Sequence, residues 1–269
     1  MIKQFLITAL LLATSPMAFA GESPWSEIAP GTRMRLIASD IITNGKTLAA
    51  IELDMPQTTK TYWRIPGETG IPVQLELEGS ANIGSGEIIW PYPERQLDKG
   101  YIDFIYSGPV VLPIALSVGE GPAAIKANIM LGVCDDICVP VRADLALNID
   151  PTTPDRGQDL RIRQALADAP VAWTGDETII GDVVFDAGTR TLEIAIDTTR
   201  LDPQSLIVDN GDPSLLFSMP QKSPEAAIVS FKLLGKSTRL DLHGQPVRLT
   251  FLTEEGAFEV SRTVQVRGY

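Results

Sequence analysis

The sequence is divided into short runs in which apolar and polar residues alternate, and turn-forming residues interrupt these runs. Alternation with a period of two residues places one face of a segment in a core, which is the pattern of a β-strand. The 20 prolines and 22 glycines among 269 residues supply frequent turns between such runs. The chain is therefore predicted to be all-β. Representative strands are expected at 48–53, 73–77, 110–118, 127–133 and 145–149, and again at 178–185, 191–197, 227–234, 247–252 and 258–266.

A polar, turn-rich segment separates these two groups of strands. Residues 150–157 contain two prolines, two threonines and a glycine, which is typical of a linker. Residues 159–169 are the only convincing helix, and Pro170 closes it. We therefore expect two β-sandwich domains, residues 21–150 and 173–269, joined by a linker and short helix at 151–172.

The first twenty residues are typical of a secretory signal peptide. Lys3 gives a positive start, residues 5–13 are apolar, and Ala18 and Ala20 form a small-residue cleavage site before Gly21. The apolar run is too short to span a membrane, and no later apolar stretch approaches eighteen residues. The mature protein is therefore expected to be exported to the periplasm, with no direct membrane insertion.

The chain is acidic, with a formal net charge of −12. Such a balance argues against nucleic-acid binding, because the phosphate backbone attracts basic surfaces. The chain also has no basic run that would attract anionic lipids.

Cys134 and Cys138 are the only cysteines, and in an oxidising compartment they are expected to form a disulfide. Closing a five-residue ring would stabilise the fold by only about 2 kcal/mol, against about 4.7 kcal/mol for a loop of about 100 residues. A chain of this length can also bury a sizeable core without a covalent link. These considerations favour a redox-active pair over a structural bridge.

The surroundings of the two cysteines predict a hairpin. Alternating apolar residues at 129–133 lead into Cys134, and a similar pattern at 145–149 follows Cys138. The pair should therefore lie at the tip of a strand–turn–strand unit, where a thiolate of another protein can approach. Asp135 and Asp136 are turn formers, and their charges would raise the pKa of a neighbouring thiol. The sequence thus favours exchange with a chosen partner over indiscriminate reactivity.

Two other hypotheses remain open at this stage. The disulfide could be structural, in a non-catalytic binding module. Alternatively, the two thiolates could hold Cu(I), with Met130 or His243 as a further ligand. A zinc site is not expected, because zinc needs four ligands and the chain has no third cysteine. In the favoured interpretation the protein binds no metal and needs no cofactor.

Four segments, in order, resemble the N-terminal periplasmic domain of the DsbD and ScsB family of thiol:disulfide interchange proteins. They are the aromatic, proline and glycine segment 61–72, the Trp90-Pro91 segment within 87–95, the Leu112-Pro113 strand within 111–114, and the loop Cys134-Asp135-Asp136-Ile137-Cys138 with Val139 and Pro140. The resemblance covers about residues 30–150, and the second group of strands is similar to the longer N-terminal regions of ScsB-like members.

The resemblance implies immunoglobulin-like sandwiches and a role in electron transfer as a protein-disulfide reductase. A separate membrane-embedded electron donor of the DsbD or CcdA type would reduce the cysteine pair, which would then reduce periplasmic thioredoxin-fold proteins. By position, Cys138 would attack the partner disulfide and Cys134 would resolve the mixed disulfide.

The chain also departs from the family pattern. Its cysteine loop is shorter than that of DsbD, and residues 96–101 lack the acidic and aromatic cap loop that shields the pair there. Candidate residues for shielding or partner contact are Trp90, Tyr92, Tyr101, Asp135 and Asp136.

Overall fold

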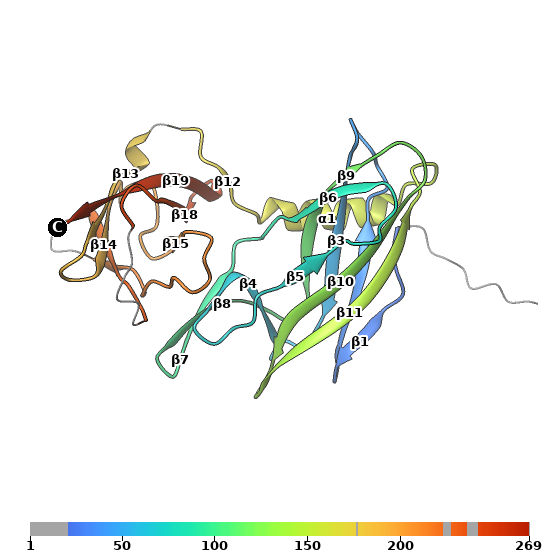
Figure 1. Ribbon diagram of the computed structural model, residues 1–269, viewed down its shortest axis with the longest axis horizontal. Coiled ribbons are helices and arrows are strands. Elements are labelled where there is room, and N and C mark those ends of the chain that lie inside the picture. The colour runs from blue at the N-terminus through green and yellow to red at the C-terminus, as the bar shows by residue number, and fades with distance from the viewer. Residues whose placement is uncertain (1–20, 176, 223–226, 236–241, 269) are drawn as a thin grey trace, which may run out of the picture.

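The computed structural model describes residues 21–175, 177–222, 227–235 and 242–268. The predicted signal peptide, residues 1–20, lies outside the described residues. The structure is mostly β, with one α-helix between two groups of strands (Figure 1). This confirms the predicted secondary-structure class and the position of the helix between the groups.

The first group forms two sheets. One has the order β1-β2-β3-β9-β6, and the other has the order β11-β10-β4-β8-β7, with β5 paired to β10. The bounds are β1 Ser26–Ala29, β2 Thr32–Ala38, β3 Lys46–Asp54, β4 Lys60–Gly67, β5 Gln74–Glu76, β6 Ile83–Ile88, β7 Glu94–Asp98, β8 Tyr101–Ser107, β9 Val110–Val118, β10 Ala123–Cys134 and β11 Cys138–Ile149.

A single core fills the space between these two sheets. Alternate residues of each strand point into it, for example Leu36 and Ile51 from the first sheet and Trp63, Phe104 and Leu131 from the second. The period-two pattern in the sequence therefore determines which face of each sheet is buried.

The helix α1, Arg156–Ala167, covers the outer face of the first sheet. Its Ile162 is fully buried against Ile37 and Ala50. The helix begins three residues earlier than predicted, because the side chain of Asp155 accepts hydrogen bonds from the backbone N–H groups of Gly157 and Gln158 and caps the first turn.

The second group forms one continuous path of strands, in the order β15-β18-β19-β13-β14-β17-β16, with β12 paired to β19. The bounds are β12 Val171–Ala172, β13 Ile180–Asp186, β14 Thr191–Ile196, β15 Ile207–Asp209, β16 Gln221–Lys222, β17 Ile228–Lys232, β18 Pro246–Thr253 and β19 Gly256–Arg267, with a 3-10 turn at Glu177–Ile179. The long strand β19 joins the two parts of this path, because it pairs with β18 along 256–263 and then with β13 along 264–267.

The second group has its own core, to which β13, β14, β17, β18 and β19 all contribute. Residues of β15, at one end of the strand path, and of β17, near the other end, meet in this core, so the sheet folds around it. The main core of the first group contains residues up to Ile149 and, from the second group, only Ile207 among its fully buried members. The two groups therefore have separate hydrophobic cores.

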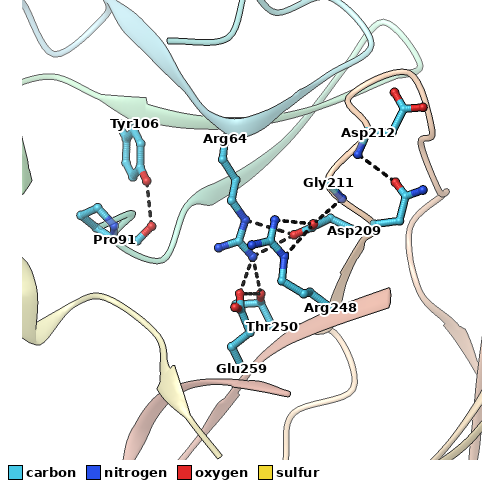
Figure 2. Close-up of polar contacts among 10 residues, drawn as sticks. Arg64, Pro91, Tyr106, Asp209, Gly211, Asp212, Arg248, Thr250 and Glu259 are labelled. Atoms are coloured by element: carbon cyan, nitrogen blue, oxygen red, sulfur yellow. Dashed lines mark hydrogen bonds and ion pairs between the residues drawn. The ribbon is translucent and has the colours of Figure 1, made fainter. Parts of the chain in front are cut away.

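Buried polar contacts join the two groups. Arg64 of β4 donates hydrogen bonds to Asp209 at 3.0 and 2.8 Å, and it also contacts Thr250 and Glu259 (Figure 2). Arg248 pairs with the other carboxylate oxygen of Asp209. The network thus contains two arginines and two carboxylates, and it attaches the second group to strand β4.

A second set of contacts lies beside this network. Arg95 donates to the backbone carbonyls of Gln204 and Leu206, and the hydroxyl of Tyr92 donates to the carbonyl of Ser205.

Within the described ranges, no helix is long and apolar enough to cross a membrane.

Candidate functional site

Cys134 and Cys138 form a disulfide at the end of the β10–β11 hairpin. The two residues are paired directly across the hairpin, and their Cα atoms are 4.0 Å apart. The hairpin end points to the bottom of the view in Figure 1. The predicted disulfide and its place at a hairpin tip are both confirmed.

The two sulfurs lie in different surroundings. Cys134 is fully buried because its strand, β10, lies inside the sheet and Cys134 pairs with Lys60 of β4. Cys138 is exposed, since β11 is the edge strand of the same sheet. An incoming thiolate can therefore reach the sulfur of Cys138 more readily than that of Cys134.

A small cluster separate from the main core surrounds the buried sulfur. It consists of Tyr62, Ile105 and Cys134. Trp63 packs into the main core, so its neighbour Tyr62 points to the opposite, outer face of the sheet. Tyr62 and Ile105 are paired across β4 and β8, which brings them together beside Cys134.

The hydroxyl group of Tyr62 contacts both sulfurs. Its oxygen lies 2.9 Å from Sγ of Cys134 and 3.2 Å from Sγ of Cys138. Burial of the phenol raises the pKa of Tyr62 above its ordinary value, and the charge of Asp103 raises the pKa further. The hydroxyl therefore keeps its proton at neutral pH and can donate it in a hydrogen bond to a thiolate.

Two glycines make room for the Tyr62 ring. A Cβ atom on Gly70 would lie 2.3 Å from Cδ1 of Tyr62, and a Cβ atom on Gly132 would lie 3.2 Å from Cδ2. A side chain at Gly70 would therefore displace the ring. The close approach of backbone and ring fixes where the hydroxyl lies.

Charged groups flank the cluster on the same sheet. The ammonium of Lys60 lies 5.9 Å from the centre of the Tyr62 ring and 4.0 Å from the carboxylate of Asp103, and it also contacts Gln96. Asp103 in turn accepts a hydrogen bond from the backbone N–H of Thr69 at 3.0 Å. One cation and one anion therefore balance each other near the disulfide.

The turn between the cysteines is exposed and partly apolar. Asp135 and Asp136 are exposed, so water screens their charges. Ile137 is 76% exposed and Val139 is 41% exposed, next to the accessible sulfur of Cys138. The turn and the start of β11 therefore expose apolar surface beside Cys138.

The aromatic candidates from the sequence lie elsewhere. Trp90 and Tyr92 pack against the main core, and the hydroxyl of Tyr92 is bonded to the second group of strands. Burial raises the pKa of Tyr92 to about 12. Tyr101 is exposed at the β7–β8 turn. The aromatic residue at the sulfurs is instead Tyr62, which sequence reasoning missed; the available signal was its alternation with the core residue Trp63.

In the described ranges, no group of three or more histidine, cysteine, aspartate or glutamate side chains is placed to hold a metal ion. His243 makes other contacts.

Comparisons with known proteins bear on the family and the fold of this chain. Residues 32–149 match the family described as "Thiol:disulfide interchange protein DsbD, N-terminal". The solved N-terminal periplasmic domain of ScsB from Proteus mirabilis is similar over 92% of this chain and 99% of its own, with a TM-score of 0.72 and 20% sequence identity. At this identity the likeness shows a shared fold.

Two further comparisons add nothing to the assignment. A chimeric titin Z1Z2 structure aligns with a TM-score of only 0.19 and 8% identity, which is too low to indicate a common fold. No curated protein sequence matches the chain significantly.

Proposed function

Residues 32–149 belong to the family of DsbD N-terminal domains, and from that membership we propose that the protein is a periplasmic thiol:disulfide interchange protein. The observation that carries the proposal is the asymmetric disulfide within this domain. One sulfur is exposed on an edge strand, and the other is buried beside a tyrosine hydroxyl. A structural bridge would have no need of an accessible sulfur.

The proposed reaction transfers two electrons to a partner. In the reduced protein, the thiolate of Cys138 attacks one sulfur of the partner disulfide, forms a mixed disulfide and releases a partner thiolate. The thiolate of Cys134 then attacks Sγ of Cys138. This forms the Cys134–Cys138 disulfide and releases the second partner thiolate, so the partner gains two electrons.

The exposure of the two cysteines supports these roles. The attacking sulfur must reach another protein, and Cys138 is exposed. The resolving sulfur needs only to lie within bonding distance of the attacking one, and Cys134 is buried opposite it. Neither step requires a cofactor.

The proposed partners follow from the same chemistry. A separate membrane-embedded donor of the DsbD or CcdA type would return electrons to the disulfide, and periplasmic thioredoxin-fold proteins would receive them. The exposed Ile137 and Val139 would contact the partner while the sulfurs exchange. Asp135, Asp136 and Tyr101 lie exposed and remain candidates for partner contact.

We assign the chemistry to an immunoglobulin-like domain at 21–150 and propose that the β domain at 173–269 orients partners or docks the membrane donor. Separate cores on either side of the linker and helix at 151–172 support this division. Export by the predicted signal peptide agrees with the periplasmic origin of the similar ScsB domain.

Trapping of a mixed disulfide tests the proposal. Reduced Cys134→Ser protein, incubated with an oxidised thioredoxin-fold protein, should accumulate a covalent adduct that reducing agent dissolves. Cys138→Ser is the matched control and should give at least tenfold less adduct. Equal trapping by both variants would contradict the assigned roles. No trapping by either would favour the non-catalytic module with a structural bridge.

A further inference from the structure

The first described residue, Gly21, is built into the fold of the first domain. Its carbonyl accepts a hydrogen bond of 2.8 Å from the backbone N–H of Ala38, and Glu22 bridges to Ile37. Gly21 is buried. Gly21 therefore lies beside the end of β2, which stops two residues before Asp40.

The position of Gly21 leaves no room for a side chain. Its φ angle is +77°, which favours glycine. A Cβ atom would lie 2.6 Å from Cβ of Asp155 and 3.1 Å from the carbonyl oxygen of Ala38. Gly21 therefore packs between β2 and the residue that caps α1.

Asp40 provides an unsatisfied carboxylate that shares a neighbour with Gly21, because Asp155 lies against Gly21 and its charge acts on Asp40. It is fully buried, and its Oδ1 accepts a hydrogen bond of 3.2 Å from the backbone N–H of Asp150. Among the described residues, Oδ2 has no hydrogen-bond partner. Burial raises the pKa of Asp40 to about 6, and the charges of Asp150 and Asp155 add to the effect. Burying a charged carboxylate is costly unless a cation pairs with it.

The other charged groups around this carboxylate have partners of their own. Asp155 caps α1, and Asp150 accepts hydrogen bonds from Thr152 and Thr153. Both arginines of β2 are paired, Arg35 with Glu22 and Glu52, and Arg33 with Asp54. The described residues thus supply no cation to Oδ2 of Asp40, and no cluster there is suited to a metal.

We propose that Asp40 is the binding site for the α-ammonium group of Gly21, which export creates. Hydrolysis of the Ala20–Gly21 bond consumes one water, leaves a carboxylate on Ala20 and leaves an amine on Gly21, which takes up a proton. This inference rests on the predicted removal of residues 1–20, and it does not depend on the chemistry of the disulfide.

The ammonium suits the site in its charge and in its number of donors. It carries three N–H donors, so it can bind Oδ2 of Asp40 and still donate to a backbone carbonyl such as that of Ala38. Its positive charge also offsets the charges of Asp150 and Asp155. Removal of the leader therefore completes a buried ion pair where β2, the linker and α1 meet.

The test compares two mature chains, one beginning at Gly21 and one that retains Ala20. Both are made with wild-type Asp40 and with Asp40→Asn, a change that asparagine tolerates at the observed φ of 57°. The exposed Asp98→Asn is the matched control. The retained alanine should lower Tm by about 5 °C or more in the wild-type background and in the control. It should have little effect in Asp40→Asn.

A second measurement separates an ion pair from general stability. In the chain that begins at Gly21, limiting acetic anhydride should acetylate the α-amine at least tenfold more slowly with wild-type Asp40 than with Asp40→Asn. Mass spectrometry follows the rate. Three results would overturn the proposal: equal acetylation in the two proteins, an equal effect of the added alanine in both backgrounds, or cleavage during export at another bond. Failure of disulfide exchange would leave these results unchanged.

Discussion

The hydroxyl oxygen of Tyr62 lies 2.9 Å from Sγ of Cys134 and 3.2 Å from Sγ of Cys138. In the sequence, the tyrosine is 72 positions from the first cysteine and 76 positions from the second. A buried phenol that keeps its proton is a good donor to a thiolate. The contact therefore links strand β4 directly to both sulfurs of the disulfide.

Removing this hydroxyl should make the thiolate less stable relative to the thiol. In reduced Tyr62→Phe protein, we expect the pKa of the reacting thiol to rise by about 1 unit, because a hydrogen bond to a charged group is lost. The rate of iodoacetamide alkylation as a function of pH measures this shift. Tyr101→Phe, on the exposed β7–β8 turn, should leave the profile unchanged. An unshifted profile in Tyr62→Phe would mean that the hydroxyl does not stabilise the thiolate.

The close packing around the Tyr62 ring gives an independent prediction. Gly70→Ala would place a methyl group 2.3 Å from Cδ1 of Tyr62, so the ring must move. We expect a loss of about 1–3 kcal/mol in the free energy of unfolding, together with slower thiol–disulfide exchange. Gly119→Ala is the control, since its nearest neighbour atom would be 3.8 Å away. Denaturant unfolding and exchange kinetics check both effects, and equal behaviour of the two variants would refute the packing argument.

The attachment of the second domain should depend on Arg64. Arg64→Met removes one of the two arginines that pair with the buried Asp209, and it leaves Glu259 without this partner. We expect destabilisation of about 2–3 kcal/mol and faster proteolysis in the linker at 150–157. Arg163→Met breaks only an exposed pair with Asp159 and should cost less than about 0.5 kcal/mol. Unchanged proteolysis in Arg64→Met would show that other contacts suffice to hold the domains together.

The pKa of Asp40 predicts a pH dependence in a chain that retains Ala20. Because burial raises this pKa from 3.8 to about 6, the folded state holds the proton more tightly than the unfolded state. The resulting stabilisation is complete below about pH 3.8 and is lost as pH rises through about 6. Asp40→Asn should flatten this part of the curve, and so should a free Gly21 amine. Urea unfolding between pH 4 and 7 would detect the difference; identical curves would rule out a role for Asp40.

Much of the first domain could be predicted from the sequence because its strands and turns are determined by residues close together in the chain. Alternation marks β9 at its observed bounds, and the runs around the cysteines mark the hairpin. The disulfide follows from the presence of only two cysteines in a chain that the sequence predicts to be exported. The helix follows from its flanking turn residues, although its start was misplaced by three residues.

The missed features depend on contacts between distant segments. Tyr62 reaches the sulfurs through the pairing of β4 with β8 and β10, and its seat depends on Gly70 and Gly132. The contact between Arg64 and Asp209 joins residues 145 positions apart. Period-two patterns give the face of a strand but not its neighbours, so neither contact could be derived from the sequence. The order of the strands in the second group depends likewise on how the long strand β19 changes partners.

The redox potential of the Cys134–Cys138 pair tests the central claim most directly. Thiol labelling of the mature protein across graded glutathione and dithiothreitol buffers would give the value, with circular dichroism recorded in parallel. An exchange protein should have a potential above about −300 mV and stay folded when reduced. A disulfide that resists reduction until the protein unfolds would contradict the account and indicate a structural bridge.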